Sequence, residues 1–204
     1  MNLPNKLTIA RIFAIPLIII VALIPFFSKV LVFGEAEDAV TLENIIILII
    51  FSLASFTDFL DGYLARKNNL ITNFGKFMDP LADKLLVLTT LIYLLERGRI
   101  IAFGFSLGFV VTLILAREFL VTGIRLLAVD NNIVIAASKL GKVKTVSQML
   151  MIIILLINSY PFTLLGTTAK EIVALAVISL AGLLTLVSGI DYLIKNKDII
   201  TISK

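Results

Sequence analysis

The residues from Asp58 to Asp83 constrain this chain more than any other part of its sequence. The segment reads DFLDGYLARKNNLITNFGKFMDPLAD and holds four aspartates. Apolar runs flank it on both sides: ENIIILIIFSLASF precedes it and LLVLTTLIYLL follows it. A carboxylate inside a membrane span is costly and marks a functional site by default. The fold must therefore place these carboxylates where something neutralises their charge.

The composition is that of an integral membrane protein. Of the 204 residues, 59% are hydrophobic and 16% are charged, whereas soluble domains carry about 25% charged residues. Cysteine and histidine are absent, which excludes disulfides, thiolate metal sites and a histidine general base. Metal and acid–base chemistry must then depend on Asp and Glu, whose oxygens favour Mg²⁺ or Mn²⁺. The net charge of +4 suits an anionic lipid surface or a phosphorylated substrate rather than nucleic acid, because no soluble basic domain is present.

Six apolar segments predict an all-α integral membrane protein with six transmembrane helices in a single domain, residues 1–204. The first apolar run has no small-residue cleavage site after it, which favours a retained span over a signal peptide. Thr41 is placed to cap the second helix, and the residues before Lys144 are expected to form a polar connector. At about 20 residues per span, the expected spans are 8–27, 44–66, 73–95, 100–129, 143–160 and 169–194.

The distribution of Lys and Arg predicts the orientation of these spans. Basic residues gather at the N-terminus, in the turn after Arg66, in the SKLGKVK segment and in the C-terminal tail. The loops on the other side carry fewer basic residues and several acidic ones. We therefore expect a multi-pass protein of a bacterial cell membrane with both termini in the cytoplasm. All four aspartates would then line a polar active-site cavity that faces the cytoplasm.

Helix geometry gathers the four carboxylates. Asp58 and Asp61 are three residues apart, and Asp79 and Asp83 are four apart, so each pair shares a helical face. The short turn between the two helices makes them antiparallel neighbours. Four unpaired carboxylates in a small volume would have to take up protons, whereas two divalent cations about 4 Å apart would cancel the charge and could clamp a phosphoryl displacement. The alternative is that these aspartates cap helices or pair with nearby lysines.

The residues between the aspartates suit a phosphate ligand. Gly62 and Gly75 have no side chains and let a large ligand approach the backbone. Arg66 follows one turn after Gly62 and can bind a phosphate through two parallel hydrogen bonds.

The complete pattern is Asp58-x2-Asp61-Gly62-x2-Ala65-Arg66-x8-Gly75-x3-Asp79-x3-Asp83. It resembles the signature of the CDP-alcohol phosphatidyltransferase family in every fixed position. The resemblance implies a six-helix membrane enzyme, usually a homodimer, that moves a phosphatidyl group from CDP-diacylglycerol to an alcohol and releases CMP. It also implies a site with two divalent cations, Mg²⁺ or Mn²⁺.

The implied metal ligands are Asp58, Asp61, Asp79 and Asp83, of which Asp83 is also the catalytic general base. The implied CDP-diacylglycerol-binding residues are Gly62, Ala65, Arg66 and Gly75, and Thr8 is a further candidate that an ordinary interfacial helix would explain equally well.

The basic residues must identify the acceptor, because the aspartate signature does not. Arg117 and Arg125 are eight residues apart on the fourth span and roughly share a helical face, and Glu118 beside Arg117 can pair with one partner. We expect these arginines to form an acceptor phosphate-binding pocket together with three lysines, which positive-inside anchoring would also explain. The lysines are Lys139, Lys142 and Lys144.

Three further segments favour glycerol 3-phosphate as the acceptor. AREFLVTGIRLLA from Ala116, SKLGKVKTVSQM from Ser138 and the opening NLPNKLTIAR are similar to those of family members that use glycerol 3-phosphate. The implied product is phosphatidylglycerophosphate, the precursor of phosphatidylglycerol. Inositol phosphate, serine and phosphatidylglycerol are alternative acceptors within the family. A cation transporter or a structural scaffold would also explain charge inside a membrane, but neither explains the glycines and arginine at fixed spacing.

Overall fold

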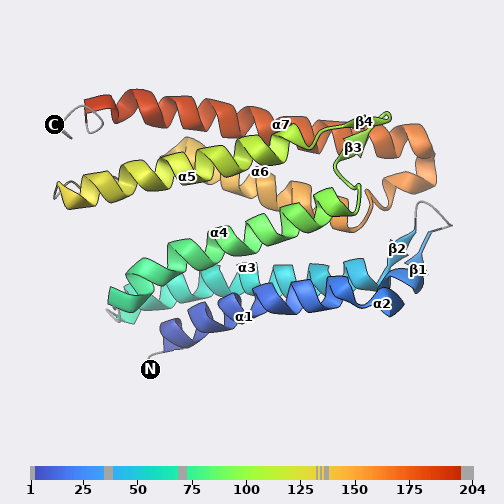
Figure 1. Ribbon diagram of the computed structural model, residues 1–204, viewed down its shortest axis with the longest axis horizontal. Coiled ribbons are helices and arrows are strands. Elements are labelled where there is room, and N and C mark those ends of the chain that lie inside the picture. The colour runs from blue at the N-terminus through green and yellow to red at the C-terminus, as the bar shows by residue number, and fades with distance from the viewer. Residues whose placement is uncertain are drawn as a thin grey trace.

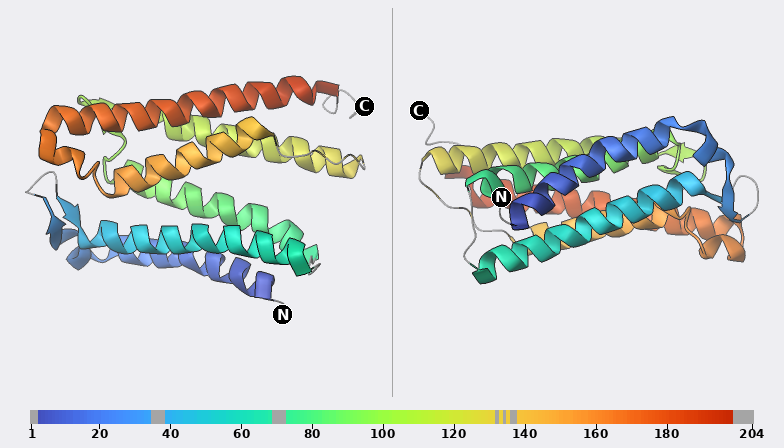
Figure 2. Two further views of the ribbon diagram at one scale, coloured as in Figure 1. Left: turned by 180° about the vertical axis from the view of Figure 1, so that it is seen from behind. Right: turned by 90° about the horizontal axis from the view of Figure 1, so that it is seen from below.

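The computed structural model describes residues 3–34, 39–68, 73–131, 133, 135 and 138–198. These residues form a bundle in which long helices run roughly along one axis (Figures 1 and 2). Within the described ranges there are six such helices, one for each expected span, and the all-α prediction is confirmed. They are α1 (Leu3–Leu23), α3 (Leu42–Asn68), α4 (Asn73–Glu96), α5 (Phe109–Asp130), α6 (Lys139–Leu156) and α7 (Thr167–Lys195).

The helices pack as two groups that meet at α4. Helix α1 packs against α3 and α4, while α7 packs against α5 and α6, and α4 contacts both α5 and α6. One apolar core runs through both groups, because each helix contributes side chains that no solvent reaches. Its most buried members include Ile18, Ile47, Leu86, Leu91, Ile114, Ile152 and Ile178.

Large apolar side chains also cover the outside of the bundle. Phe13, Phe119 and Leu183, on three different helices, are each more than half exposed. A helix that is apolar on its outer face as well as its inner face suits a lipid environment. Among the described residues, α7 is the one helix that is both long and apolar enough to cross a membrane, and shorter apolar stretches cover Leu7–Leu23 and Leu42–Thr57.

The two ends of the bundle differ in construction. At the aspartate end, α3 ends and α4 begins, and the first residues of α1 and the last residues of α7 lie at the same end of the bundle (Figure 1). The other end, here called the hairpin end, holds the short elements of the chain. These are α2 (Pro25–Lys29), β1 (Leu31–Phe33), β2 (Val40–Thr41), β3 (Ile101–Ala102), β4 (Phe105–Ser106) and the 3₁₀ helix η2 (Phe162–Leu165).

Several of the expected helix boundaries are wrong. The helix expected at 8–27 covers Leu3–Leu23, and the one expected to end at 160 ends at Leu156. The span expected from residue 100 begins at Phe109, because β3 and β4 pair as a hairpin through the two-residue loop Phe103–Gly104. Both loop residues have positive φ, +50° and +77°, as a tight hairpin turn requires, and the loop is anchored where the Phe103 N–H donates to Glu171 Oε2 at 2.7 Å. The connector expected before Lys144 is also shorter than predicted, because α6 begins at Lys139 with Ser138 as its N-cap.

The predicted cap of α3 is confirmed, and it lies beside an ion pair between a buried glutamate and an exposed arginine at the hairpin end. The Asn44 N–H donates to Thr41 Oγ1 at 3.4 Å. Glu43, which is 1% exposed, accepts from the Arg97 guanidinium at 2.8 Å. Partial burial lowers the pKa of Arg97, but Glu43 and Tyr93 together raise it, so the pKa lies above its ordinary value. This pair joins the start of α3 to the end of α4.

Candidate active site

The two helices that carry the aspartates meet at the aspartate end of the bundle. Asp58 and Asp61 lie in the last turns of α3, and Asp79 and Asp83 lie in the first turns of α4. The helices contact each other, and both predicted pairs fall on helical backbone. The side chains of the first three aspartates and the turn 69–72 lie outside the described residues, so the predicted convergence of four carboxylates stays a prediction.

The predicted nucleotide-binding residues lie on the same two helix ends. Gly62, Ala65 and Arg66 belong to α3 and Gly75 belongs to α4, and their side-chain surroundings lie outside the described residues. The fifth candidate, Thr8 on α1, is buried at 1% exposure.

Arg11 brings the start of α1 to the same place on α3. Its side chain is 1% exposed, and its Nε donates to the Ala54 carbonyl at 3.4 Å. Ala54 lies one helical turn before Asp58, so this contact sets α1 beside the aspartate segment.

Asp83 lines a small polar cavity between α4, α5 and α6. The cavity measures about 30 Å³, and its lining residues are Asp83, Lys84, Val87, Leu88, Glu118, Lys144, Thr145 and Gln148. A polar cavity of this size has room for a water molecule. The proposed general base therefore lies next to a carboxylate of α5 and a lysine of α6.

Glu118 joins two cations from different helices. Its Oε1 accepts a hydrogen bond from Arg117 Nη1 at 3.1 Å and a short one from Lys144 Nζ. Glu118 is 9% exposed and Lys144 is 3% exposed. The expectation that Glu118 pairs with one partner is wrong, because α6 brings Lys144 to the same oxygen atom.

A second chain of hydrogen bonds ties α4 to this cluster. Lys84 Nζ donates to Thr122 Oγ1 at 2.5 Å, and Thr122 Oγ1 donates to the Glu118 carbonyl at 2.7 Å. The residue next to Asp83 is thereby connected to the backbone of α5. The relative positions of the base and the basic cluster are thus set by side chains of three helices.

The side chain of Arg117 lies between two glycines, Gly189 and Gly141. A methyl group at Gly189 of α7 would lie 3.1 Å from Arg117 Cγ, and one at Gly141 of α6 would lie 3.7 Å from Arg117 Nη2. The absence of a side chain at Gly189 leaves room for the arginine stem, whereas a methyl group at Gly141 would meet the guanidinium at an ordinary contact distance. The head of Arg117 therefore lies against the first turn of α6, where Ser138 caps the helix by accepting from the Gly141 N–H at 3.0 Å.

The Arg117 guanidinium retains a donor that no described residue accepts from. Its Nε is buried and without a hydrogen-bond partner in the described part of the chain. A buried donor without a partner is unfavourable. The first turn of a helix presents backbone N–H groups that bind anions, so this corner of the bundle has the properties of a phosphate site.

The other predicted acceptor residues do not share one pocket with Arg117. Arg125 lies over the Tyr192 ring at 5.9 Å and lines a cavity of about 320 Å³ with Lys84 and Thr122. Arg117 lines a separate apolar groove of about 570 Å³ between α5 and α7. Eight residues leave the two arginines about 80° apart around a helix, which accounts for the different cavities, and their joint action on one acceptor phosphate stays a prediction.

The three lysines also differ from one another. Lys139 and Lys142 lie in the first turn of α6 with exposed side chains, whereas Lys144 is buried against Glu118. Lys139 and Lys142 can thus reach a ligand from solvent. Sequence reasoning missed Thr122, Gln148 and Gly189, whose long-range partners no local spacing reveals.

The metal prediction is consistent with the available donors. Carboxylates in the first and last turns of adjacent helices are hard oxygen ligands of the kind that Mg²⁺ and Mn²⁺ prefer. Among the side chains that the structure describes, no cluster of three or more acidic residues occurs, but three of the four predicted ligands lie outside that set.

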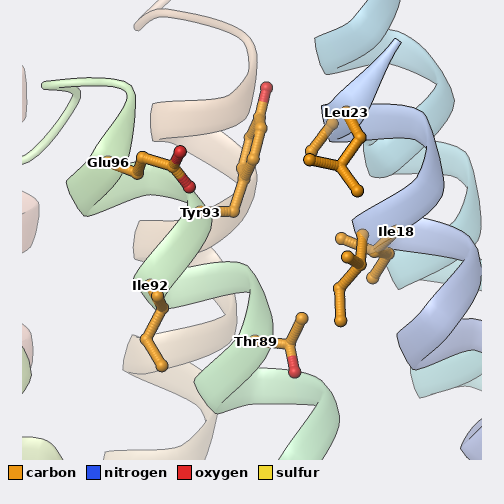
Figure 3. Close-up of a pocket in the computed structure, with 8 residues that line it drawn as sticks. Ile18, Leu23, Thr89, Ile92, Tyr93 and Glu96 are labelled. Atoms are coloured by element: carbon orange, nitrogen blue, oxygen red, sulfur yellow. The ribbon is translucent and has the colours of Figure 1, made fainter.

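A further crevice lies between α1 and α4 toward the hairpin end (Figure 3). It measures about 230 Å³ and is mainly apolar, with Ile18, Leu23 and Ile92 among its walls. Glu96 is the one charged residue among those described as lining it. It therefore lacks the basic groups that a phosphorylated substrate requires.

Comparison with known proteins gives a consistent result. The model of the CDP-alcohol phosphatidyltransferase family matches residues 1–187. A relative from Bacillus subtilis (strain 168) is 42% identical over 195 residues, which cover 96% of this chain and 95% of the relative. One from Rickettsia felis is 39% identical over 94% of this chain and 93% of its own, and one from Haemophilus influenzae is 33% identical over 94% and 91%. All three are named CDP-diacylglycerol–glycerol-3-phosphate 3-phosphatidyltransferase.

Proposed function

Since the chain belongs to the CDP-alcohol phosphatidyltransferase family, we propose that it transfers the phosphatidyl group of CDP-diacylglycerol to glycerol 3-phosphate. The products are phosphatidylglycerophosphate and CMP. The names of relatives aligned over nearly the whole chain support this choice of acceptor. Within the structure, the observation that carries it is the Arg117 guanidinium at the first turn of α6, with a buried Nε that has no described partner.

The reaction is a displacement at phosphorus in which Asp83 acts as the base. The acceptor hydroxyl oxygen forms a bond to the phosphorus that carries diacylglycerol, the bond from that phosphorus to the CMP oxygen breaks, and the hydroxyl proton passes to the Asp83 carboxylate. With no histidine in the chain, a carboxylate is the plausible base. Asp83 lines the cavity that also holds Glu118 and Lys144, which supports a location between the nucleotide and the acceptor.

We assign two divalent cations, Mg²⁺ or Mn²⁺, to Asp58, Asp61, Asp79 and Asp83. When bound, such cations neutralise the diphosphate and make CMP a better leaving group. The positions of these residues on two contacting helix ends support the assignment. Gly62, Ala65, Arg66 and Gly75 lie on the same ends and would bind the CDP moiety, with Thr8 contributed by α1.

The acceptor phosphate would lie at the start of α6. Arg117 supplies a guanidinium that is already oriented by Glu118, and α6 supplies its N-terminal turn. Lys139 and Lys142 add exposed positive charge beside it. Arg125 and Lys144 contribute to the positive potential of this region.

We further propose a single domain of six membrane spans with the aspartate end in the cytoplasm, acting as a homodimer in a bacterial membrane. The start of α1, the end of α7 and the start of α6 lie toward the aspartate end (Figures 1 and 2), together with the lysines that favour the cytoplasmic side. Because the chain has no cysteine, single cysteines can report the topology. In intact cells a membrane-impermeant maleimide should label Thr168→Cys, at the hairpin end, but not Lys197→Cys.

A CMP-release assay tests the proposed function. Purified protein in detergent with CDP-diacylglycerol and Mg²⁺ should release CMP when glycerol 3-phosphate is added. Inositol phosphate, serine and phosphatidylglycerol serve as the alternative acceptors. Faster CMP release with one of them would identify that compound as the acceptor in place of glycerol 3-phosphate. No release with any of the four would contradict the transferase assignment.

Two variants test the acceptor site. Arg117→Ala should raise the KM for glycerol 3-phosphate about ten- to a hundredfold, as expected for loss of a charge-assisted contact, while the KM for CDP-diacylglycerol changes little. Lys139→Ala should give a smaller increase because its side chain is exposed. Equal effects on both substrates would argue against a separate acceptor pocket.

A further inference from the structure

We propose that Glu118 is a positioning residue for the acceptor. Its carboxylate would hold Arg117 and Lys144 in the geometry that accepts glycerol 3-phosphate. This inference rests on the proposed function, and it goes further by assigning a role to an acidic residue in a site for an anion. The observation behind it is that one oxygen atom, Oε1, receives hydrogen bonds from both cations.

The charges explain why an anion site needs this carboxylate. Arg117 and Lys144 come from different helices and would repel each other when brought together in a buried place. Glu118 lies between them, and its one negative charge faces two positive charges. The cluster can thus exist before the acceptor binds and still attract a phosphate.

Glu118 also decides which atoms of Arg117 remain available. Its hydrogen bond engages Nη1, while Nη2 lies near Gly141 in the first turn of α6 and Nε has no described partner. A guanidinium held by one corner presents its other donors in a fixed direction. Without the carboxylate, Arg117 would keep its charge but lose this orientation.

A purely structural role for Glu118 is the main alternative. The hydrogen-bonded connection of α4 to α5 does not depend on the carboxylate, because Lys84 donates to Thr122 Oγ1, which donates to the Glu118 carbonyl. The chain also offers a matched control, since Glu43 is another buried glutamate paired with an arginine, but at the hairpin end. Replacing each by glutamine removes the same charge from opposite ends of the bundle.

The kinetic test compares Glu118→Gln with Glu43→Gln. Glu118→Gln should raise the KM for glycerol 3-phosphate about tenfold or more, with less than about a twofold change in the KM for CDP-diacylglycerol. Glu118→Asp, which keeps the charge, should recover part of the loss. Glu43→Gln should lower the melting temperature and leave both KM values unchanged. An unchanged acceptor KM in Glu118→Gln, or equal changes for both substrates, would overturn the proposal.

A labelling test reads the position of Lys144 without using activity. In the unmodified protein an amine-reactive reagent should modify Lys142, which is exposed, and spare Lys144, which is 3% exposed. In Glu118→Gln, Lys144 should become reactive although the variant is still folded, that is, although its melting temperature is higher than the labelling temperature. Continued protection of Lys144 in the folded variant would overturn the proposal. If the unmodified protein releases no CMP with glycerol 3-phosphate, the proposed function fails, and this measurement still decides whether Glu118 positions Lys144.

Discussion

The two ends of the bundle each contain a buried glutamate paired with an arginine, and they use it differently. At the hairpin end, Glu43 accepts from Arg97 Nε at 3.1 Å and Nη2 at 2.8 Å, and Nη2 also donates to the Ala22 carbonyl at 2.7 Å. The guanidinium further lies over the Tyr93 ring at 5.7 Å. At the aspartate end, Glu118 pairs with two cations, Arg117 and Lys144, and the Arg117 Nε is a buried donor without a described partner.

This difference separates a structural ion pair from a binding site. One carboxylate against one guanidinium cancels charge, and Arg97 Nη2 also donates to the Ala22 carbonyl, so the pair joins α1, α3 and α4. One carboxylate against two cations leaves a net positive charge and an unused donor. A buried cluster of charged groups with an unused donor makes the aspartate end a candidate binding site. The following predictions set substitutions at one end against substitutions at the other.

The largest effect is expected from Asp83→Asn. Loss of the general base should lower kcat by about 10²- to 10⁴-fold, and the similar volume of asparagine should leave the melting temperature nearly unchanged. CMP release and thermal unfolding in the same detergent measure the two quantities. A variant that retains most of its kcat would show that another group takes the proton.

Removal of divalent cations should also abolish activity. Chelation with EDTA should stop CMP release, and Mg²⁺ or Mn²⁺ in excess should restore it, because the diphosphate charge would otherwise remain uncompensated. The same ions should raise the melting temperature of the unmodified protein, since a ligand that binds the folded state stabilises it. Glu43→Gln, far from the aspartates, should keep this response, and Asp79→Asn should weaken it.

At the hairpin end the expected effect is on stability. Arg97→Leu leaves the buried Glu43 carboxylate without its cation, which should lower the folding free energy by less than the ~3 kcal/mol expected for a fully buried pair, because the Arg97 side chain is 36% exposed. The KM values of both substrates should stay the same, because Arg97 lies at the opposite end from the aspartates. A melting temperature equal to that of the unmodified protein would show that solvent reaches Glu43 in the variant.

Much of the fold could be predicted because apolar runs and caps are local signals. The last span was expected at 169–194, and α7 covers Thr167–Lys195; the cap at Thr41 was also correct. The hairpin at 101–106 was missed because its residues are apolar and continue the pattern of the following helix. The available signal was Gly104 in the turn Phe103–Gly104, since glycine readily adopts the positive φ that a two-residue hairpin loop requires.

The candidate site was predictable where its residues are close in sequence. The two aspartate pairs fall on helices as their spacing indicated. The contact of Glu118 with Lys144 joins residues 26 positions apart, and no periodicity relates them. Such a contact depends on how α5 and α6 pack. For the same reason Arg117 and Arg125, which looked equivalent in the sequence, line different cavities.

The smallest effect is expected where Gly189 contacts the Arg117 side chain. In Gly189→Ala, the new methyl group would lie 3.1 Å from Arg117 Cγ, a distance at which the arginine must shift by a few tenths of an ångström. The KM for glycerol 3-phosphate should rise about two- to fivefold, since a shifted charge-assisted contact weakens by less than its complete loss of about 1.5–3 kcal/mol. Gly123→Ala is the matched control, because a methyl group there meets nothing within 4 Å and alanine favours the helix. That variant should keep both KM values, and equal behaviour of the two alanine variants would mean that Gly189 does not position Arg117.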